Sequence, residues 1–150
     1  MKIAIVIASN GLLACELLQM AERAVGQVEN VRTIQFQEGE SIEELVYRYR
    51  QANKELDTTH GTAFLIDARL SCHQYVASQL VHELKNGCVI TGINLPMLIS
   101  LFLYEINETD ITSFASKAKL YGIAGIHLIE NHDIETAMKG NQYNNLLSEV

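Results

Sequence analysis

The chain has 150 residues, of which 48% are hydrophobic and 19% are charged, a composition that fits one globular domain. Its 11 Lys and Arg residues against 18 Asp and Glu residues give a formal charge of −7, which excludes the broad positive surface of a nucleic-acid-binding protein. The cysteines Cys15, Cys72 and Cys88 form no C-x-x-C pair, so we predict a reducing, cytoplasmic setting without a disulfide framework, metal or cofactor. The apolar start at residues 3–8 is too short for a membrane span, and we predict no direct membrane insertion.

Short apolar runs alternate with stretches of helical periodicity along the chain, which is typical of parallel β-α units. We predict strands at residues 3–8, 31–36, 62–66 and 88–91. The second alternates apolar and polar residues, as a half-exposed outer strand does. The sequence therefore predicts an α/β fold, with a parallel sheet of four strands flanked by helices in a single domain over residues 1–150.

Capping residues and apolar spacing predict the helices between these strands. The first helix follows a Ser-Asn-Gly turn and ends near Gly26. Capping boxes at residues 41–44 and 71–74 predict the starts of the second and third helices, and Pro96 suits the first turn of the fourth. The positions predicted to face the core are Leu13, Leu17, Ala21 and Ala24; Ile42, Leu45, Val46, Tyr49 and Leu56; Val76, Leu80, Val81 and Leu84; and Met97, Leu98, Leu101 and Phe102.

The last third of the chain is less regular. We predict a helix capped by Asp110 that runs to Tyr121 and stops at Gly122, followed by a fifth strand at residues 123–129. Residues 130–150 are polar and weakly patterned, and we predict a C-terminal extension there.

Three loops stand where a parallel α/β sheet binds its ligands, which is beyond the carboxyl ends of the strands. They are residues 9–12, 67–74 and 92–96. Each leads into the amino end of a helix, whose free N–H groups suit a phosphate or another anion. The alternative is that Ser9, Asn10, Ser71 and Asn94 merely cap these helices.

Four segments in these and neighbouring regions carry a family resemblance over roughly residues 1–125. They read IVIASNGLLA, QFQEGESIEEL, FLIDARLSCHQYVA and VITGINLPMLISL. Their order and spacing resemble the IIA component of the mannose-family bacterial phosphotransferase system (PTS), a sugar-specific phosphocarrier. The family motifs are S-H-G-x-x-A, P/E-G-E-S, T-D-x-x-G-G-S-P-x-N and G-x-N-L-P-M-L, and the last is the most specific match.

The resemblance implies several further properties. It implies that the fifth strand, at residues 123–129, is antiparallel and exchanged across a homodimer, and that the partners are the phosphocarrier protein and a IIB component. It also implies a cytoplasmic protein, either free or peripheral to a membrane permease complex. An apolar segment such as 123–129 would not remain a free edge, which also favours a homodimer.

The resemblance further implies a catalytic site in which a histidine carries the phosphoryl group and an aspartate orients it. Asn10 occupies the histidine position, and Asp67 matches the aspartate. An amide nitrogen is a poor nucleophile, so Asn10 cannot replace the histidine. We name His73 as a surrogate acceptor, against the simpler interpretation of an exposed first-turn residue. The remaining candidate binding residues are Ser9, Gly11, Arg69, Ser71, Cys72 and Asn94.

Two function hypotheses follow. The first is a mannose-family IIA component of phosphoenolpyruvate-dependent sugar uptake. The second is a non-catalytic regulatory or binding relative that recognises PTS proteins without carrying phosphate. A receiver-like domain with Asp67 as acceptor is rejected, because Ala8-Ser9-Asn10 offers no acidic pair for Mg²⁺. A nucleotide-binding fold is weak, because neither G-x-G-x-x-G nor a phosphate loop occurs.

Overall fold

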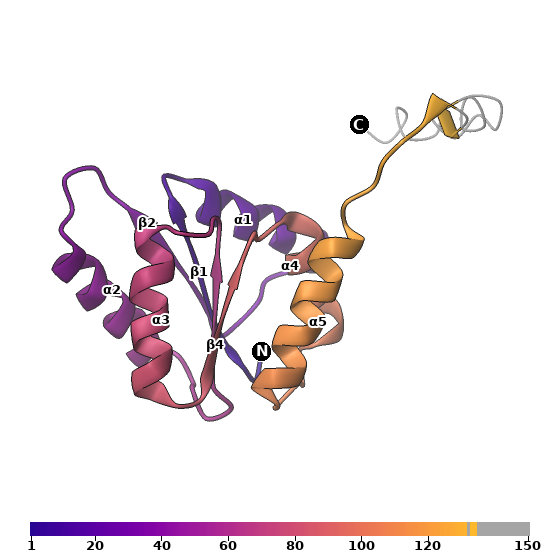
Figure 1. Ribbon diagram of the computed structural model, residues 1–150. Coiled ribbons are helices and arrows are strands. Elements are labelled where there is room, and N and C mark those ends of the chain that lie inside the picture. Colours follow the sequence, from indigo (N-terminus) through magenta and orange to yellow (C-terminus); the bar gives the residue numbers. More distant parts are fainter. Residues whose placement is uncertain (132, 135–150) are drawn as a thin grey trace.

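The computed structural model describes residues 1–131 and 133–134, so most of the predicted extension at 130–150 lies outside the described residues (Figure 1). Four parallel strands form one sheet in the order β2-β1-β3-β4: β1 (Ala4–Asn10), β2 (Val31–Phe36), β3 (Thr62–Ile66) and β4 (Gly87–Thr91). The register places Ile5 opposite Val31, and Thr62 opposite both Ala4 and Gly87. The predicted fold class is confirmed.

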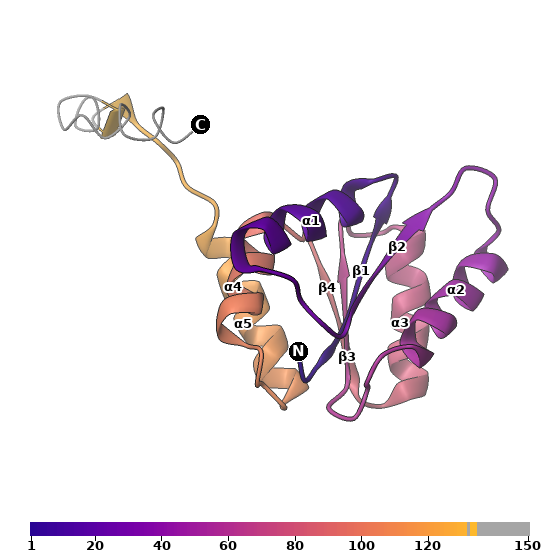
Figure 2. The ribbon, with the colours of Figure 1, turned by 180° about the vertical axis from the view of Figure 1, so that it is seen from behind.

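Five helices cover both faces of this sheet (Figures 1 and 2). The helices α1 (Leu13–Val25), α4 (Leu95–Tyr104) and α5 (Ile111–Ala124) pack on one face, and α2 (Ile42–Lys54) and α3 (Cys72–Leu84) pack on the other. The side chains of β1 alternate between the two layers, since Ile5 and Ile7 join the first core cluster while Val6 joins the second. A strand buried on both faces therefore reads as a continuous apolar run.

The chain order creates a crevice at the carboxyl edge of the sheet. The connection after β1 leads to α1 on one face, whereas the connection after the neighbouring strand β3 leads to α3 on the opposite face. Open parallel sheets bind their ligands outside the strand ends at such a switch point. The loops at residues 10–12 and 67–71 border this switch point, which we call the crevice.

The predicted buried face of α1 is confirmed at Ala21 and wrong at both of its ends. Leu13 is 47% exposed and Ala24 is exposed, whereas Ala14, next to Leu13, is fully buried. The reason lies at the helix start, where the buried Ser9 hydroxyl accepts the Ala14 N–H at 2.7 Å and turns that side of the helix inward.

The predicted end of the last helix is also wrong, and the predicted fifth strand does not form within the single chain. Helix α5 continues through Gly122 to Ala124, and residues 126–129 are exposed and lack regular structure. Glycine does not end the helix here because it permits close packing: a Cβ on Gly122 would lie 2.6 Å from the Met97 Cε on α4. The isoleucine-rich pattern at 123–129 therefore begins on a helix.

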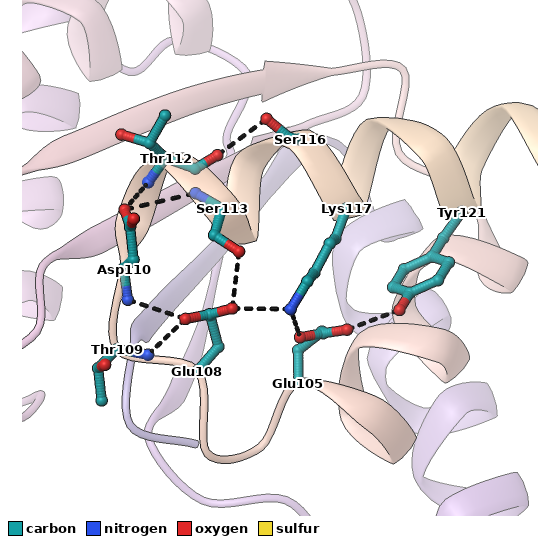
Figure 3. Close-up of polar contacts among 9 residues, drawn as sticks. All are labelled: Glu105, Glu108, Thr109, Asp110, Thr112, Ser113, Ser116, Lys117 and Tyr121. Carbon is teal, nitrogen blue, oxygen red and sulfur yellow. Dashed lines mark hydrogen bonds and ion pairs between the residues drawn. The ribbon is translucent and has the colours of Figure 1, made fainter.

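A polar network fixes α4 against α5 at the amino edge of the sheet, far from the crevice (Figure 3). The Lys117 Nζ lies 2.6 Å from Glu105 Oε2 and 2.7 Å from Glu108 Oε2, and the Tyr121 hydroxyl donates to Glu105 Oε1 at 2.6 Å. The hydrogen bond from Lys117 is the main reason why the pKa of Glu108 falls to about 2. We assign this network a structural role, because it closes the α4–α5 hairpin.

Candidate functional site

The crevice between the ends of β1 and β3 brings Asn10 and Asp67 together. The backbone N–H of Asn10 donates to Asp67 Oδ2 at 3.1 Å. The other carboxylate oxygen, Oδ1, accepts the Ala68 N–H at 2.7 Å, and the Asp67 N–H donates to the Ala8 carbonyl at 3.1 Å. The carboxylate therefore bridges the two loops and holds residue 10 at the mouth of the crevice.

Residues 9–11 form the first wall of the site. Ser9 is fully buried and caps α1, because its hydroxyl accepts the Ala14 N–H. Asn10 is exposed, and Gly11 follows with a φ of 61°, a conformation that favours glycine. The turn thus leaves residue 10 exposed to solvent while its backbone N–H is bonded to the Asp67 carboxylate.

His73 lies in the first turn of α3, but it is fully buried, so the alternative interpretation of an exposed first-turn residue is wrong. The Tyr49 hydroxyl on α2 lies 2.9 Å from His73 Nδ1, and the Phe36 ring packs edge-on at a centroid distance of 6.2 Å. These aromatic neighbours come from β2 and α2. The sequence gives no local signal for this burial, because it depends on contacts made 24 and more residues away.

The protonation state of His73 follows from this environment. Burial lowers its pKa, and the nearby charge of Asp67 and the backbone of Ser9 oppose that shift without reversing it. Burial also raises the pKa of Tyr49, so the phenol stays protonated, and its hydroxyl shares one hydrogen bond with Nδ1 of the imidazole. The other ring nitrogen, Nε2, is a buried atom without a hydrogen-bond partner among the described residues.

Two other candidate residues, Ser71 and Asn94, cap helices α3 and α4, and a third, Cys72, is the first residue of α3. The Ser71 hydroxyl accepts the Gln74 N–H at 3.2 Å and caps α3, with Cys72 half-buried beside it. The Asn94 side chain accepts the Met97 N–H at 3.0 Å, caps α4, and donates to the Gly122 carbonyl at 2.9 Å. The capping interpretation therefore describes Ser9, Ser71 and Asn94, while Asn10 caps no helix.

Arg69 is exposed in the loop between β3 and α3, two residues beyond Asp67. Within residues 1–131 and 133–134, no group of three or more His, Cys, Asp or Glu side chains is arranged to hold a metal ion. The same part of the chain contains no helix that is long and apolar enough to cross a membrane.

The loop after β2 also lies at the carboxyl edge of the sheet, and it is not one of the three loops that were predicted to bind ligands. Residues between the end of β2 and the second turn of α2 line an open hollow of about 640 Å³. Arg48 donates to Glu40 at 2.9 Å and to the Gln35 carbonyl at 2.7 Å. Burial alone would raise the pKa of Glu40, but the bond from Arg48 holds it below its usual value. The lining residues are Gln37, Glu38, Gly39, Glu40, Glu43, Glu44, Tyr47 and Arg48.

Comparisons with known proteins bear on this site. The family model EIIA-man, described as the PTS system fructose IIA component, matches residues 4–119, which include the Asn10 turn and the loop after β3. The chain is 34% identical over 137 residues to the PTS system mannose-specific EIIAB component of Escherichia coli strain K12. That match covers 91% of the chain and 42% of the relative, so the chain spans less than half of that protein's length.

Two further similarities agree with this match. The chain is 26% identical over 99 residues to the PTS system fructose-specific EIIA component of Bacillus subtilis strain 168, which covers 66% of the chain and 68% of that protein. Among solved structures, the mannose/sorbose specific IIA subunit from Enterococcus faecalis has a TM-score of 0.79 at 19% identity. The superposition covers 87% of this chain and 96% of that one, and it shows a shared fold.

Proposed function

The chain belongs to the EIIA-man family of PTS IIA components, and we propose that it acts as the IIA component of a sugar-uptake system, binding that system's phosphocarrier protein and IIB component. The observation that carries this proposal is the bridge from Asp67 to the backbone of residue 10. It supports a site whose loops still present residue 10 to an incoming protein. The relatives are described as sugar-specific PTS components, which favours sugar uptake over the regulatory alternative.

The proposal assigns no phosphoryl group to Asn10. Its amide nitrogen is delocalised into the carbonyl and cannot attack phosphorus. His73 is an equally unsuitable acceptor in this conformation, because its ring is fully buried, its Nδ1 is engaged by the Tyr49 hydroxyl and its Nε2 is closed off from solvent. We therefore propose that Asn10 and Asp67 form the docking site, and that this site acts at the cytoplasmic face of a membrane permease complex.

Binding to the two partners tests this function. We expect the chain to bind the purified phosphocarrier protein or the purified IIB component with micromolar affinity, of about 1–100 µM, as transient encounters do. Isothermal titration calorimetry measures it, and Lys54→Ala, an exposed residue in the last turn of α2, serves as the control. If neither partner binds at concentrations of several hundred micromolar, the proposed function is wrong.

We also propose a homodimer that forms along the free edge of β4. Among the described residues this strand pairs only with β3, and two hollows of about 250 and 440 Å³ lie between it and α5. The apolar residues Ile126, Leu128 and Ile129 are 76%, 82% and 60% exposed. Residues 126–129 of one protomer, added to β4 of the other as an antiparallel strand, would cover both the edge and these side chains.

Light scattering checks the dimer. The native protein is expected to have the mass of two chains at micromolar concentration, and Leu128→Glu is expected to have the mass of one, because it places a charge in the exchanged strand. Tyr47→Glu, on α2 beyond the opposite edge of the sheet, is the matched control and should remain a dimer. A monomeric native protein would contradict the proposal.

A further inference from the structure

Residue 10 is followed by glycine, and an asparagine that precedes a glycine can react with its own backbone. The backbone nitrogen of the glycine, once deprotonated, attacks the side-chain carbonyl carbon of the asparagine and closes a five-membered imide. Glycine favours this reaction because it has no side chain to shield its nitrogen and because its backbone turns freely. The chain contains two such pairs, Asn10-Gly11 and Asn86-Gly87, and their surroundings differ.

The Asn10-Gly11 pair is open to this attack. Asn10 is exposed, and its side-chain amide makes no hydrogen bond to another described residue. The Gly11 N–H likewise donates to no acceptor in the described part of the chain. Gly11 has a φ of 61°, and a Cβ built on it would meet no heavy atom within 4 Å beyond its chain neighbours. The attacking nitrogen and the attacked carbon therefore lie in an uncrowded turn.

The Asn86-Gly87 pair is held in place by the sheet. The Asn86 carbonyl accepts the Thr62 N–H at 3.2 Å, and Gly87 begins β4 opposite Thr62. A Cβ on Gly61 would lie 3.0 Å from both Cγ and Nδ2 of Asn86, so this side chain packs against the residue before β3. Closing the imide requires the peptide between the two residues to rotate, which would break the bond to Thr62. The second pair is therefore an internal control for the first.

We propose that Asn10 is a site of spontaneous deamidation, at which water converts the asparagine to aspartate or isoaspartate. The Gly11 nitrogen loses its proton and bonds to Cγ of Asn10, the bond from Cγ to Nδ2 breaks, and Nδ2 takes up a proton and leaves as ammonia. Water then opens the imide at one of its two carbonyls. Opening at one carbonyl gives aspartate, and opening at the other gives isoaspartate, whose backbone is longer by a CH₂ group. This modification goes beyond the proposed function and does not depend on it.

The reaction changes the charge at the crevice. Asp67 Oδ2 accepts the N–H of residue 10 at 3.1 Å, so either product places a second carboxylate on the residue that the first carboxylate holds. Each product also adds one negative charge to a chain of formal charge −7. Because neighbouring carboxylates repel each other, the turn is held less firmly after the reaction. Residue 10 therefore begins neutral and becomes acidic as the molecule ages.

Peptide mapping by mass spectrometry measures both sites in one sample. The folded protein is incubated at neutral pH and physiological temperature and then digested with trypsin, which releases residues 3–23 as a peptide whose sole asparagine is Asn10. We expect Asn10 to convert roughly tenfold or more faster than Asn86, because the backbone at Asn86 must first open locally. In the chain unfolded by urea, the two rates should agree within about threefold, because the surrounding structure is gone.

Two variants are matched to this measurement. Asn10→Gln keeps an amide but would have to close a larger ring, so its peptide 3–23 should show no conversion at residue 10. Gly11→Ala has room for its Cβ and should slow the conversion of Asn10 several-fold, because the methyl group shields the nitrogen. Circular dichroism checks that both variants are folded.

The products decide the outcome. Isoaspartate at residue 10, formed faster than any conversion of Asn86 and absent in Asn10→Gln, supports the proposal, because direct hydrolysis of the side chain gives aspartate alone. Equal rates at Asn10 and Asn86 in the folded protein, or no isoaspartate at residue 10 after several days, overturn it. Either result leaves the proposed function standing, since that function is measured separately by binding of the two partners.

Discussion

Asn10→His is expected to turn a chain that takes no phosphoryl group at residue 10 into one that takes close to one per protomer. Residue 10 is exposed at the end of β1, and its backbone is bonded to the Asp67 carboxylate at 3.1 Å. An imidazole introduced there has one nitrogen that can attack phosphorus and a second that a carboxylate can orient. The phosphoryl group leaves a histidine nitrogen of the phosphocarrier protein and bonds to the introduced imidazole.

Intact-protein mass measures this gain after incubation with phosphoenolpyruvate, enzyme I and the phosphocarrier protein. Asn10→Gln is the matched control, because it changes side-chain size without adding a nucleophile. Adding Asp67→Asn to Asn10→His should slow the transfer, because the amide no longer supplies the negative charge that orients and stabilises the imidazole. An acid-labile phosphoryl group on the native protein that His73→Ala abolishes would contradict our assignment, because it would make His73 the acceptor.

The strands could be predicted from the sequence because a strand that is buried on both faces is a continuous run of apolar residues. The boundaries of β2 and β3 agree with the expected ranges, and β1 and β4 differ by one or two residues at their ends. The capping box of α2 is confirmed on both sides, since Ser41 accepts the Glu44 N–H and the Glu44 side chain accepts the Ser41 N–H. Such signals lie within a few residues of one another, so sequence alone reveals them.

Features that depend on distant contacts were not predictable in the same way. Gly122 resembles a helix stop, but it continues α5 because Met97 on α4 requires close approach. The pairing of Asp67 with residue 10 was expected only from the family resemblance, since the order β2-β1-β3-β4 decides which loops meet. The burial of His73 depends on Tyr49 and Phe36, which no spacing near residue 73 indicates.

Removing the His73 side chain is expected to be among the most damaging changes in the α2–α3 layer. His73→Ala leaves a cavity between Tyr49 and Phe36 and removes the hydrogen-bond partner of the buried Tyr49 hydroxyl. Together these should lower the free energy of unfolding by about 2–4 kcal/mol, measured by urea denaturation. Tyr49→Phe removes only the hydroxyl and should cost less, about 1–2 kcal/mol. A loss below about 1 kcal/mol for His73→Ala would show that the site collapses to fill the space.

The same histidine should make stability depend on pH. Burial lowers the pKa of His73 below its ordinary value of 6.5, although Asp67 and Glu40 oppose the shift and Arg48 adds to it. The unfolded chain therefore binds a proton that the folded chain does not, so this contribution is complete above pH 6.5 and is lost as the pH falls below it. The slope for one group is at most about 1.4 kcal/mol per pH unit. His73→Gln keeps an acceptor for Tyr49 but cannot titrate, so it should lose less stability than the native protein between pH 7 and pH 5. Equal losses in the two proteins would assign the acid sensitivity to other groups, since only the native chain carries a buried imidazole at this position.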